Sequence, residues 1–474
     1  MHEEPSGQQK PERSFEELLN QLPDILYSRI KMDHPNQLLP IYSGEFVLRQ
    51  GTVDTHLTGS IDFQWFPSPG ARFRGEVLSV GGSHAASIHA MKPAELWIDD
   101  TLIGKSHVTL VAGFVSVGSN IEGSITDLAV TGDRTIAVNK IAFAVPNLRE
   151  FDGEPVRYQN NDSKGATRNR MVLENDDYKI ILDKDLNFKN KESSLNATGG
   201  YHLLYSGELT KNKGSLALNE VADVFQCLSN FLSFLNGRRT SPLFRQGVVE
   251  DEVLWCDYSS YFVDMHKSVS AWPQQQGLSG LNDLWRRFSK LWKEESNKDF
   301  LISAIHWYVE ANSLSGFTEG SIVMAQTALE LIYNWLIVEK NRFLKGKDAE
   351  GISAANKIRL LLAQLRLDSK VPSTMTNLYS YVDSRKQEEL DGPEIFVQIR
   401  NAIIHSQEEK RKKIGKLPYM VKYEALQISI WYIELSLLYI LGFSEKYHNR
   451  CSGTMWAGAG EEYVPWSLQI INNS

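Results

Sequence analysis

The spacing of apolar residues changes once along this chain of 474 residues, and that change limits the folds it can adopt. Between residues 41 and 265, short runs alternate apolar and polar side chains and are separated by glycine, which is typical of antiparallel strands. From residue 281 onward, apolar residues recur three or four positions apart, which is typical of amphipathic helices. The sequence therefore predicts an α+β multidomain protein, in which a β-rich, sandwich-like or barrel-like domain precedes an all-α helical bundle.

The same patterns divide the chain into five expected segments. These are a disordered or helical N-terminal arm (1–40), the β-rich domain (41–265) with an inserted helix (216–239), a linker rich in Ser, Gln, Gly and Pro (266–280), the helical domain (281–445) and an irregular C-terminal tail (446–474). Helices of the helical domain are expected at 281–295, 298–312, 319–340, 355–367, 377–385, 393–406 and 423–443. Glu424 and Glu434 interrupt the last of these, which favours a buried bundle helix over the alternative of a membrane span.

Composition limits the classes of function. The chain is 42% hydrophobic, contains three cysteines and has a net charge of −8. Three widely separated cysteines do not form a disulfide framework, and the polar N-terminus lacks the pattern of a signal peptide, so we expect a cytoplasmic protein with no membrane partner. Because the net charge is negative, a nucleic-acid site must come from a local basic cluster. His448 and Cys451 have a ligand-like spacing but no further ligands near them in sequence, and we expect no metal and no cofactor.

The segment 393–406 has well-marked helical features. Asp391 can cap its N-terminus, Pro393 suits the first turn and Glu394 complements the positive end of the helix dipole. At about 100° per residue, one arc of the helix is apolar and should face the core of its own domain. That arc consists of Ile395, Phe396, Ile399, Ala402 and Ile403.

The opposite arc of this helix is apolar too. Val397 and Ile404 form a second strip, with Arg400 on one side and Asn401 and His405 on the other. A helix that is apolar on both faces must be buried on both. In one interpretation a second copy of the domain covers the strip, with Val397 and Ile404 in the dimer interface and two Arg/Asn/His sets brought together across a two-fold axis. In the other, the helix is central within one domain and His405 bonds to a backbone carbonyl.

The six residues RNAIIH, from Arg400 to His405, resemble the Arg-x4-6-His signature of the HEPN superfamily. They stand late in a helical region and precede one long final helix, and the resemblance covers residues 297–443. That family often has a polar residue after the arginine, as Asn401 is here, and an acidic residue on an earlier helix, for which Glu330 is the nearest match. In its order of domains the chain also resembles anti-phage HEPN proteins of the ApeA type.

The resemblance implies a metal-independent endoribonuclease that acts as a homodimer or a higher homo-oligomer. Its catalytic residues would be Arg400, Asn401, His405 and Glu330. Histidine can act as base or acid near neutral pH, and arginine holds a permanent charge toward phosphate oxygens. The partner is then RNA, with tRNA as one candidate, and the products carry 2′,3′-cyclic phosphate and 5′-hydroxyl ends. Anti-phage defence, with a phage-derived trigger sensed by the β-rich domain, is implied by the same analogy.

A basic cluster follows the motif in an expected loop, and it consists of Lys410, Arg411, Lys412, Lys413 and Lys416. Such a cluster can guide an RNA backbone, although charge runs are more often simply solvated. A function of another class also stays open. In that alternative the helical domain is a non-catalytic HEPN-like interaction module, Arg400 and His405 only stabilise a dimer, and the β domain binds a protein or a glycan.

Overall fold

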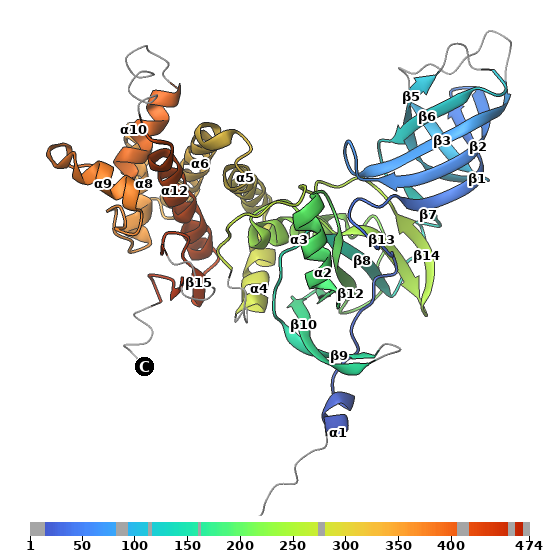
Figure 1. Ribbon diagram of the computed structural model, residues 1–474, viewed down its shortest axis with the longest axis horizontal. Helices are drawn as coiled ribbons and strands as arrows, with labels where there is room; N and C mark the ends of the chain where they lie inside the picture. The colour runs from blue at the N-terminus through green and yellow to red at the C-terminus, as the bar shows by residue number, and fades with distance from the viewer. Residues whose placement is uncertain are drawn as a thin grey trace, which may run out of the picture.

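The computed structural model describes residues 15–81, 93–111, 116–159, 163–273, 280–404, 417–453 and 460–467. Figure 1 shows three parts in sequence order: a small β-barrel, a larger β-sheet with helices on it, and a helical region at the far end of the molecule. The α+β class and the order of the parts confirm the prediction. The β-rich half, however, contains two separate β structures where the strand pattern suggested one.

The first β structure is a closed barrel with strand order β1-β2-β3-β6-β5-β4, in which β4 pairs back onto β1. Its inward-facing residues form a compact core of their own, centred on Phe46, Leu57 and Phe73. The alternation of apolar and polar residues gives the barrel an apolar interior and a polar exterior, because successive side chains of a strand point to opposite faces. The strands are β1 (Leu39–Gln50), β2 (Val53–Gln64), β3 (Gly70–Val80), β4 (Ala94–Ile98), β5 (Thr101–Val111) and β6 (Asn120–Ile125).

The second β structure is an eight-stranded sheet of order β7-β14-β13-β8-β12-β11-β10-β9. Two helices accompany it, α2 (Phe188–Thr198) and α3 (Ala222–Asn236). The sequence predicted α3 as an inserted helix but missed α2, which lies in a region interpreted as strands throughout. The strands are β7 (Val130–Gly132), β8 (Lys140–Pro146), β9 (Glu154–Gln159), β10 (Lys164–Glu174), β11 (Tyr178–Lys184), β12 (Leu203–Lys211), β13 (Leu243–Val249) and β14 (Glu252–Asp257).

The helical region contains the seven expected helices close to their predicted bounds. Its helices are α4 (Leu281–Trp292), α5 (Glu295–Asn312), α6 (Phe317–Tyr333), π-helical turns (Asn334–Lys340), α7 (Lys347–Glu350), α8 (Ala354–Gln364), α9 (Thr376–Asp383), a 3-10 turn (Lys386–Glu388), α10 (Gly392–Ile404) and α12 (Tyr419–Ile440). Most of α12 is buried among the others. Its two acids have partners, since Asn377 donates to Glu424 and Arg450 pairs with Glu434. Of the two interpretations of this helix, the buried bundle helix is therefore confirmed and the membrane span is not.

Among the described residues one helical segment, which is not α12, has the length and composition of a membrane span. The segment Phe317–Lys340 is 24 residues long, and its most apolar window has a mean hydropathy of 1.4. Within the fold 61% of that window is buried, as is usual for a central helix of a soluble bundle.

The central sheet and the helical region share one hydrophobic core. Helix α3 packs against the sheet through Phe225, whose ring lies 5.4 Å from that of Phe143, and against α4 through Phe231 and Trp285, 5.2 Å apart. Trp272, within the predicted linker, is fully buried in this shared core. Residues 271–273 of that linker are thus buried in a packed junction. The barrel has a core of its own, and a third, smaller cluster that includes Trp65 and Tyr201 joins residues of the barrel to residues of the central sheet.

Both ends of the described chain are tied to the fold. Helix α1 (Phe15–Asn20) is followed by a bridge between Asp24 and Arg157 of β9, so part of the expected arm lies along the sheet. The tail was predicted to be irregular, but β15 (Lys446–His448) pairs with β16 (Glu461–Tyr463) there. In the described part of the tail, Tyr447, Cys451 and Val464 belong to the hydrophobic core, so this part completes the packing of the helical region.

Candidate functional site

Helix α10 carries the predicted motif, and its N-terminus is firmly fixed. The Asp391 carboxylate accepts a hydrogen bond from the Glu394 backbone N–H at 2.9 Å, as an N-cap does. The Arg359 guanidinium of α8 donates two further bonds to Asp391, at 2.7 and 2.8 Å. Burial opposes ionisation of Asp391, but Arg359 and the Glu394 N–H outweigh it and lower the pKa of the carboxyl below its ordinary value. The helix is therefore anchored before the motif begins.

Replacing Asp391 with alanine is expected to lower the free energy of unfolding by about 1–2 kcal/mol at pH 7, since cap and ion pair are both lost. The folded-state pKa is depressed, so this stabilisation is complete above the unfolded value of about 3.9 and disappears as the pH falls through the folded value. Urea unfolding of both proteins between pH 7 and pH 3 measures the difference. Asp391→Asn is the matched control: its amide oxygen still caps the helix, so it should lose less. A difference that does not change with pH would contradict the ion-pair contribution.

Arg400 and Asn401 lie near the C-terminal end of α10 and contact each other. Arg400 Nη1 donates to Asn401 Oδ1 at 3.1 Å, and both side chains are partly buried. Arg400 Nε is buried and has no acceptor in the described part of the chain. A guanidinium held in this way keeps donors available for an anion.

His405 lies outside the described residues, as do the predicted RNA-binding residues Lys410, Arg411, Lys412, Lys413 and Lys416. Their roles stay predictions. What the structure fixes is the residue just before them, Ile404, which ends α10 and is 41% exposed.

Glu330 lies on α6, which packs against α10. Its carboxylate accepts a hydrogen bond from Gln326, one turn earlier on the same helix, at 3.3 Å. The described contacts bring the two helices together but do not join Glu330 to Arg400. Its assignment to the site stays a prediction.

The predicted dimer strip of Val397 and Ile404 needs a correction. Val397 is only 7% exposed and belongs to the core of its own chain, because α6, α8 and α12 all pack against α10. Ile404 alone is accessible to a partner. Much of α10 is thus a central helix of one domain, and its most exposed described residue is Ile404 at the C-terminal end.

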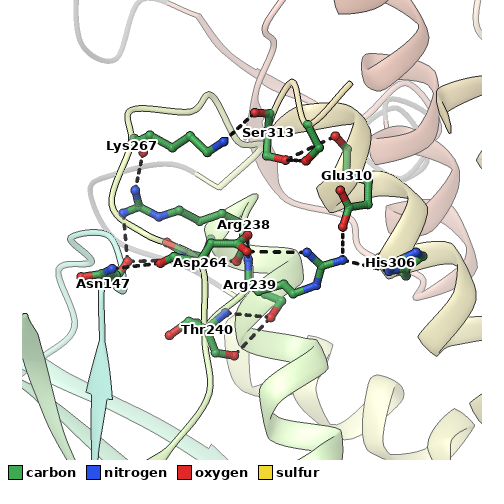
Figure 2. A network of polar contacts seen from close by, with 12 residues as sticks. Asn147, Arg238, Arg239, Thr240, Asp264, Lys267, His306, Glu310 and Ser313 are labelled. Carbon is green, nitrogen blue, oxygen red and sulfur yellow. Dashed lines mark hydrogen bonds and ion pairs between the residues drawn. The ribbon is translucent and has the colours of Figure 1, made fainter. Parts of the chain in front are cut away.

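Sequence reasoning missed a polar network between the central sheet region and α5 (Figure 2). Arg239, which follows α3, pairs with Glu310 and donates to His306 Nδ1 at 2.9 Å; its other Nη lies 3.6 Å from Asp264. Because arginine cannot accept a hydrogen bond, Nδ1 of His306 is the acceptor. Arg239 and His306 also line a cavity of about 610 Å³ between α3 and α5. No motif signals this network, since its members come from separate elements.

A second buried cluster joins the tail to the bundle. Glu434 of α12 is fully buried and accepts hydrogen bonds from Tyr308 at 2.8 Å and from Arg450 Nε at 2.8 Å. Arg450 donates further to Asn312 at 3.0 Å and to Gln427 at 3.1 Å. The C-terminal end of α5, the middle of α12 and the start of the tail are thus held together by one cluster.

Comparisons with known proteins cover most of the chain. Residues 133–269 match the model of the YopA central domain, and residues 294–462 match that of the YopA C-terminal domain. The chain is 27% identical over 442 residues to the SPbeta prophage-derived uncharacterized protein YopA of Bacillus subtilis (strain 168), covering 92% of this chain and 96% of that protein. No solved structure matches it. The two matched domains correspond to the central sheet with its helices and to the bundle with its tail.

Proposed function

We propose that the helical region is a HEPN-type bundle and acts as a metal-independent endoribonuclease, with Arg400, Asn401 and His405 at its site. The observation that carries the proposal is the path of α10. Ile399 is buried in the core, whereas Ile404, five residues later, is 41% exposed. The described part of the motif therefore runs along a capped helix to an exposed residue, Ile404, which supports access by a long substrate.

The chemistry of these residues supports RNA cleavage. The 2′-hydroxyl must lose a proton, the 5′ oxygen must gain one, and the phosphorane needs positive charge beside it. Arg400 supplies that charge, and its bond to Asn401 orients the guanidinium. His405 supplies proton transfer near neutral pH.

Pairing of two copies gives the site two histidines. The exposed Ile404 supports an interface at the end of α10, narrower than the Val397 and Ile404 strip expected from sequence. Such a dimer places both motifs near one axis. The basic residues from Lys410 to Lys416 then follow each motif directly and can guide the RNA backbone.

The biological setting we propose is the cytoplasm of a bacterium in conflict with phage. The prophage origin of the Bacillus relative supports this setting. The barrel and the central sheet restrain the nuclease or sense its trigger, because the sheet shares its core with the helical region.

The test is cleavage of total tRNA and of a labelled RNA oligonucleotide by the purified full chain in EDTA. Cuts that leave 2′,3′-cyclic phosphate and 5′-hydroxyl ends are expected. An oligonucleotide with a single 2′-deoxy substitution at the mapped cut is the matched control, because it removes only the attacking hydroxyl. Cleavage of that control would contradict the proposal. No cleavage by a protein shown to be dimeric would shift the weight toward the interaction module, since a restrained nuclease that lacks its trigger is inactive too.

A further inference from the structure

A second pocket, distant in sequence from the motif, lies where the central sheet region meets residues 266–269. Its volume is about 260 Å³. Four cationic side chains line it, namely Arg149, Lys189, Arg238 and Lys267, together with two carboxylates, Glu150 and Glu192. The lining thus has an excess of two positive charges. A charge excess in a partly enclosed site attracts anions.

Arg238 is the most buried of these cations, at 4% exposure. Its two Nη atoms donate to backbone carbonyls only, one to Lys267 and the other to Asn147 at 2.9 Å. Figure 2 shows the guanidinium of Arg238 directed away from the guanidinium of Arg239. Arg239 forms the ion pairs with Glu310 and Asp264. The Nε of Arg238 is buried with no acceptor in the described chain. Arg238 is therefore a buried cation with an unused donor.

Arg149 also has a buried hydrogen-bond donor without an acceptor. Its Nη1 is buried and lacks an acceptor among the described residues. Burial lowers the pKa of Arg149, and the carboxylate that counters this shift, Glu434, already bonds to Tyr308 and Arg450. Burial and then the charge of Arg149 lower the pKa of Arg238 to about 10. The fold thus places two guanidinium groups within electrostatic reach of each other, although like charges repel.

Asp264 and Glu192 counter the burial of Arg238, but the pKa of Arg238 is lowered overall, so the carboxylates near it do not fully compensate its charge. Glu150 accepts hydrogen bonds from Lys184 at 2.9 Å and from Lys189, and Glu192 lies 3.9 Å from Lys189. Both acids are therefore engaged by lysines. A buried arginine without a paired carboxylate destabilises a fold, and a bound anion removes that destabilisation.

We infer that this pocket binds a small molecule bearing a phosphoryl group, whose oxygens accept hydrogen bonds from Arg149 and Arg238. Arginine forks match phosphate geometry, and the excess of two positive charges matches a phosphate dianion. A volume of about 260 Å³ lies below the roughly 300–1,000 Å³ of pockets for drug-sized ligands, so a compact molecule fits and a folded polynucleotide does not. The site does not depend on RNA cleavage.

The experiment measures binding of inorganic phosphate to the full chain by calorimetry and by thermal unfolding, at constant ionic strength. Saturable binding with a rise in Tm is expected for wild type. Arg149→Met should weaken phosphate binding about tenfold or more, because a charge-assisted hydrogen bond is lost. Without phosphate, the same variant should unfold at an equal or higher temperature, since a buried unpaired charge has been removed.

Arg134→Met is the matched control, since it removes one positive charge from an exposed position outside the pocket. Lys267→Gln is a second test at an exposed position of the lining, in case Arg149→Met fails to fold; it should weaken binding less. Acetate distinguishes a phosphoryl site from a general carboxylate site. Equal binding of phosphate by wild type and both lining variants, no binding by wild type, or acetate binding as tight as phosphate binding would overturn the inference.

Discussion

RNA cleavage is expected to fall by about 10²–10⁴-fold when His405 is replaced by alanine, because that is the usual contribution of one positioned general acid or base. In a paired site both copies lose their proton-transfer group at once, so the loss should lie toward the upper end of this range. Single-turnover rates on the mapped RNA oligonucleotide, in EDTA, measure the effect. Sedimentation of the same samples reports whether the dimer persists.

The control for this variant is His56→Ala, which replaces an exposed histidine of the barrel strand β2. It should cleave RNA at the wild-type rate. The combination of readouts separates the two classes of function. Loss of cleavage with an intact dimer fits the nuclease, whereas loss of the dimer in His405→Ala would indicate the interaction module, in which the histidine only holds the copies together.

The helices of the C-terminal half could be predicted from sequence because their signal is local. An apolar residue every third or fourth position specifies a helix and its buried face within one segment. Helix α4 begins at Leu281, as expected, and α12 spans Tyr419–Ile440 where 423–443 was predicted. The capping of α10 by Asp391 could be predicted in the same way, since cap and helix are adjacent in sequence.

The division of the β-rich half could not be predicted, because it depends on long-range pairing. The barrel closes only when β4 pairs with β1, about fifty residues earlier, and strand alternation alone does not specify that partner. Helix α2 was missed for another reason. Its segment, FKNKESSLNAT, buries only Phe188 and Leu195 and shows little amphipathic pattern.

The candidate sites also differ in whether their residues are close in sequence or only in the folded structure. Arg400 and Asn401 are neighbours in sequence and in space, so a motif could find them. Arg149 and Arg238 are 89 positions apart, and only tertiary folding brings them to one pocket. The burial of Val397 also depends on packing from three other helices, which a two-faced helix pattern cannot distinguish from packing by a second copy.

Removing the carboxylate of Glu434 is expected to cause a large loss of stability. Glu434→Leu leaves Arg450, whose side chain is 2% exposed, as a buried charge without its counterion, and it deprives Tyr308 of its acceptor. Breaking a buried ion pair in this way lowers the free energy of unfolding by about 3–5 kcal/mol. For a domain of this size that corresponds to a Tm lower by about 6–20 °C, which calorimetry measures directly.

Two further variants show whether the loss of stability in Glu434→Leu comes from breaking the ion pair between Glu434 and Arg450. Lys293→Met breaks the exposed pair between Lys293 and Asp177, and it should change stability by only about 0–1 kcal/mol because solvent screens both charges. The double variant Glu434→Leu/Arg450→Met removes both buried charges and should recover part of the loss. Recovery stays partial because Asn312 and Gln427 lose the arginine to which their oxygens bond. A double variant no more stable than Glu434→Leu would mean that packing around Glu434, not the uncompensated charge of Arg450, sets the stability of this junction.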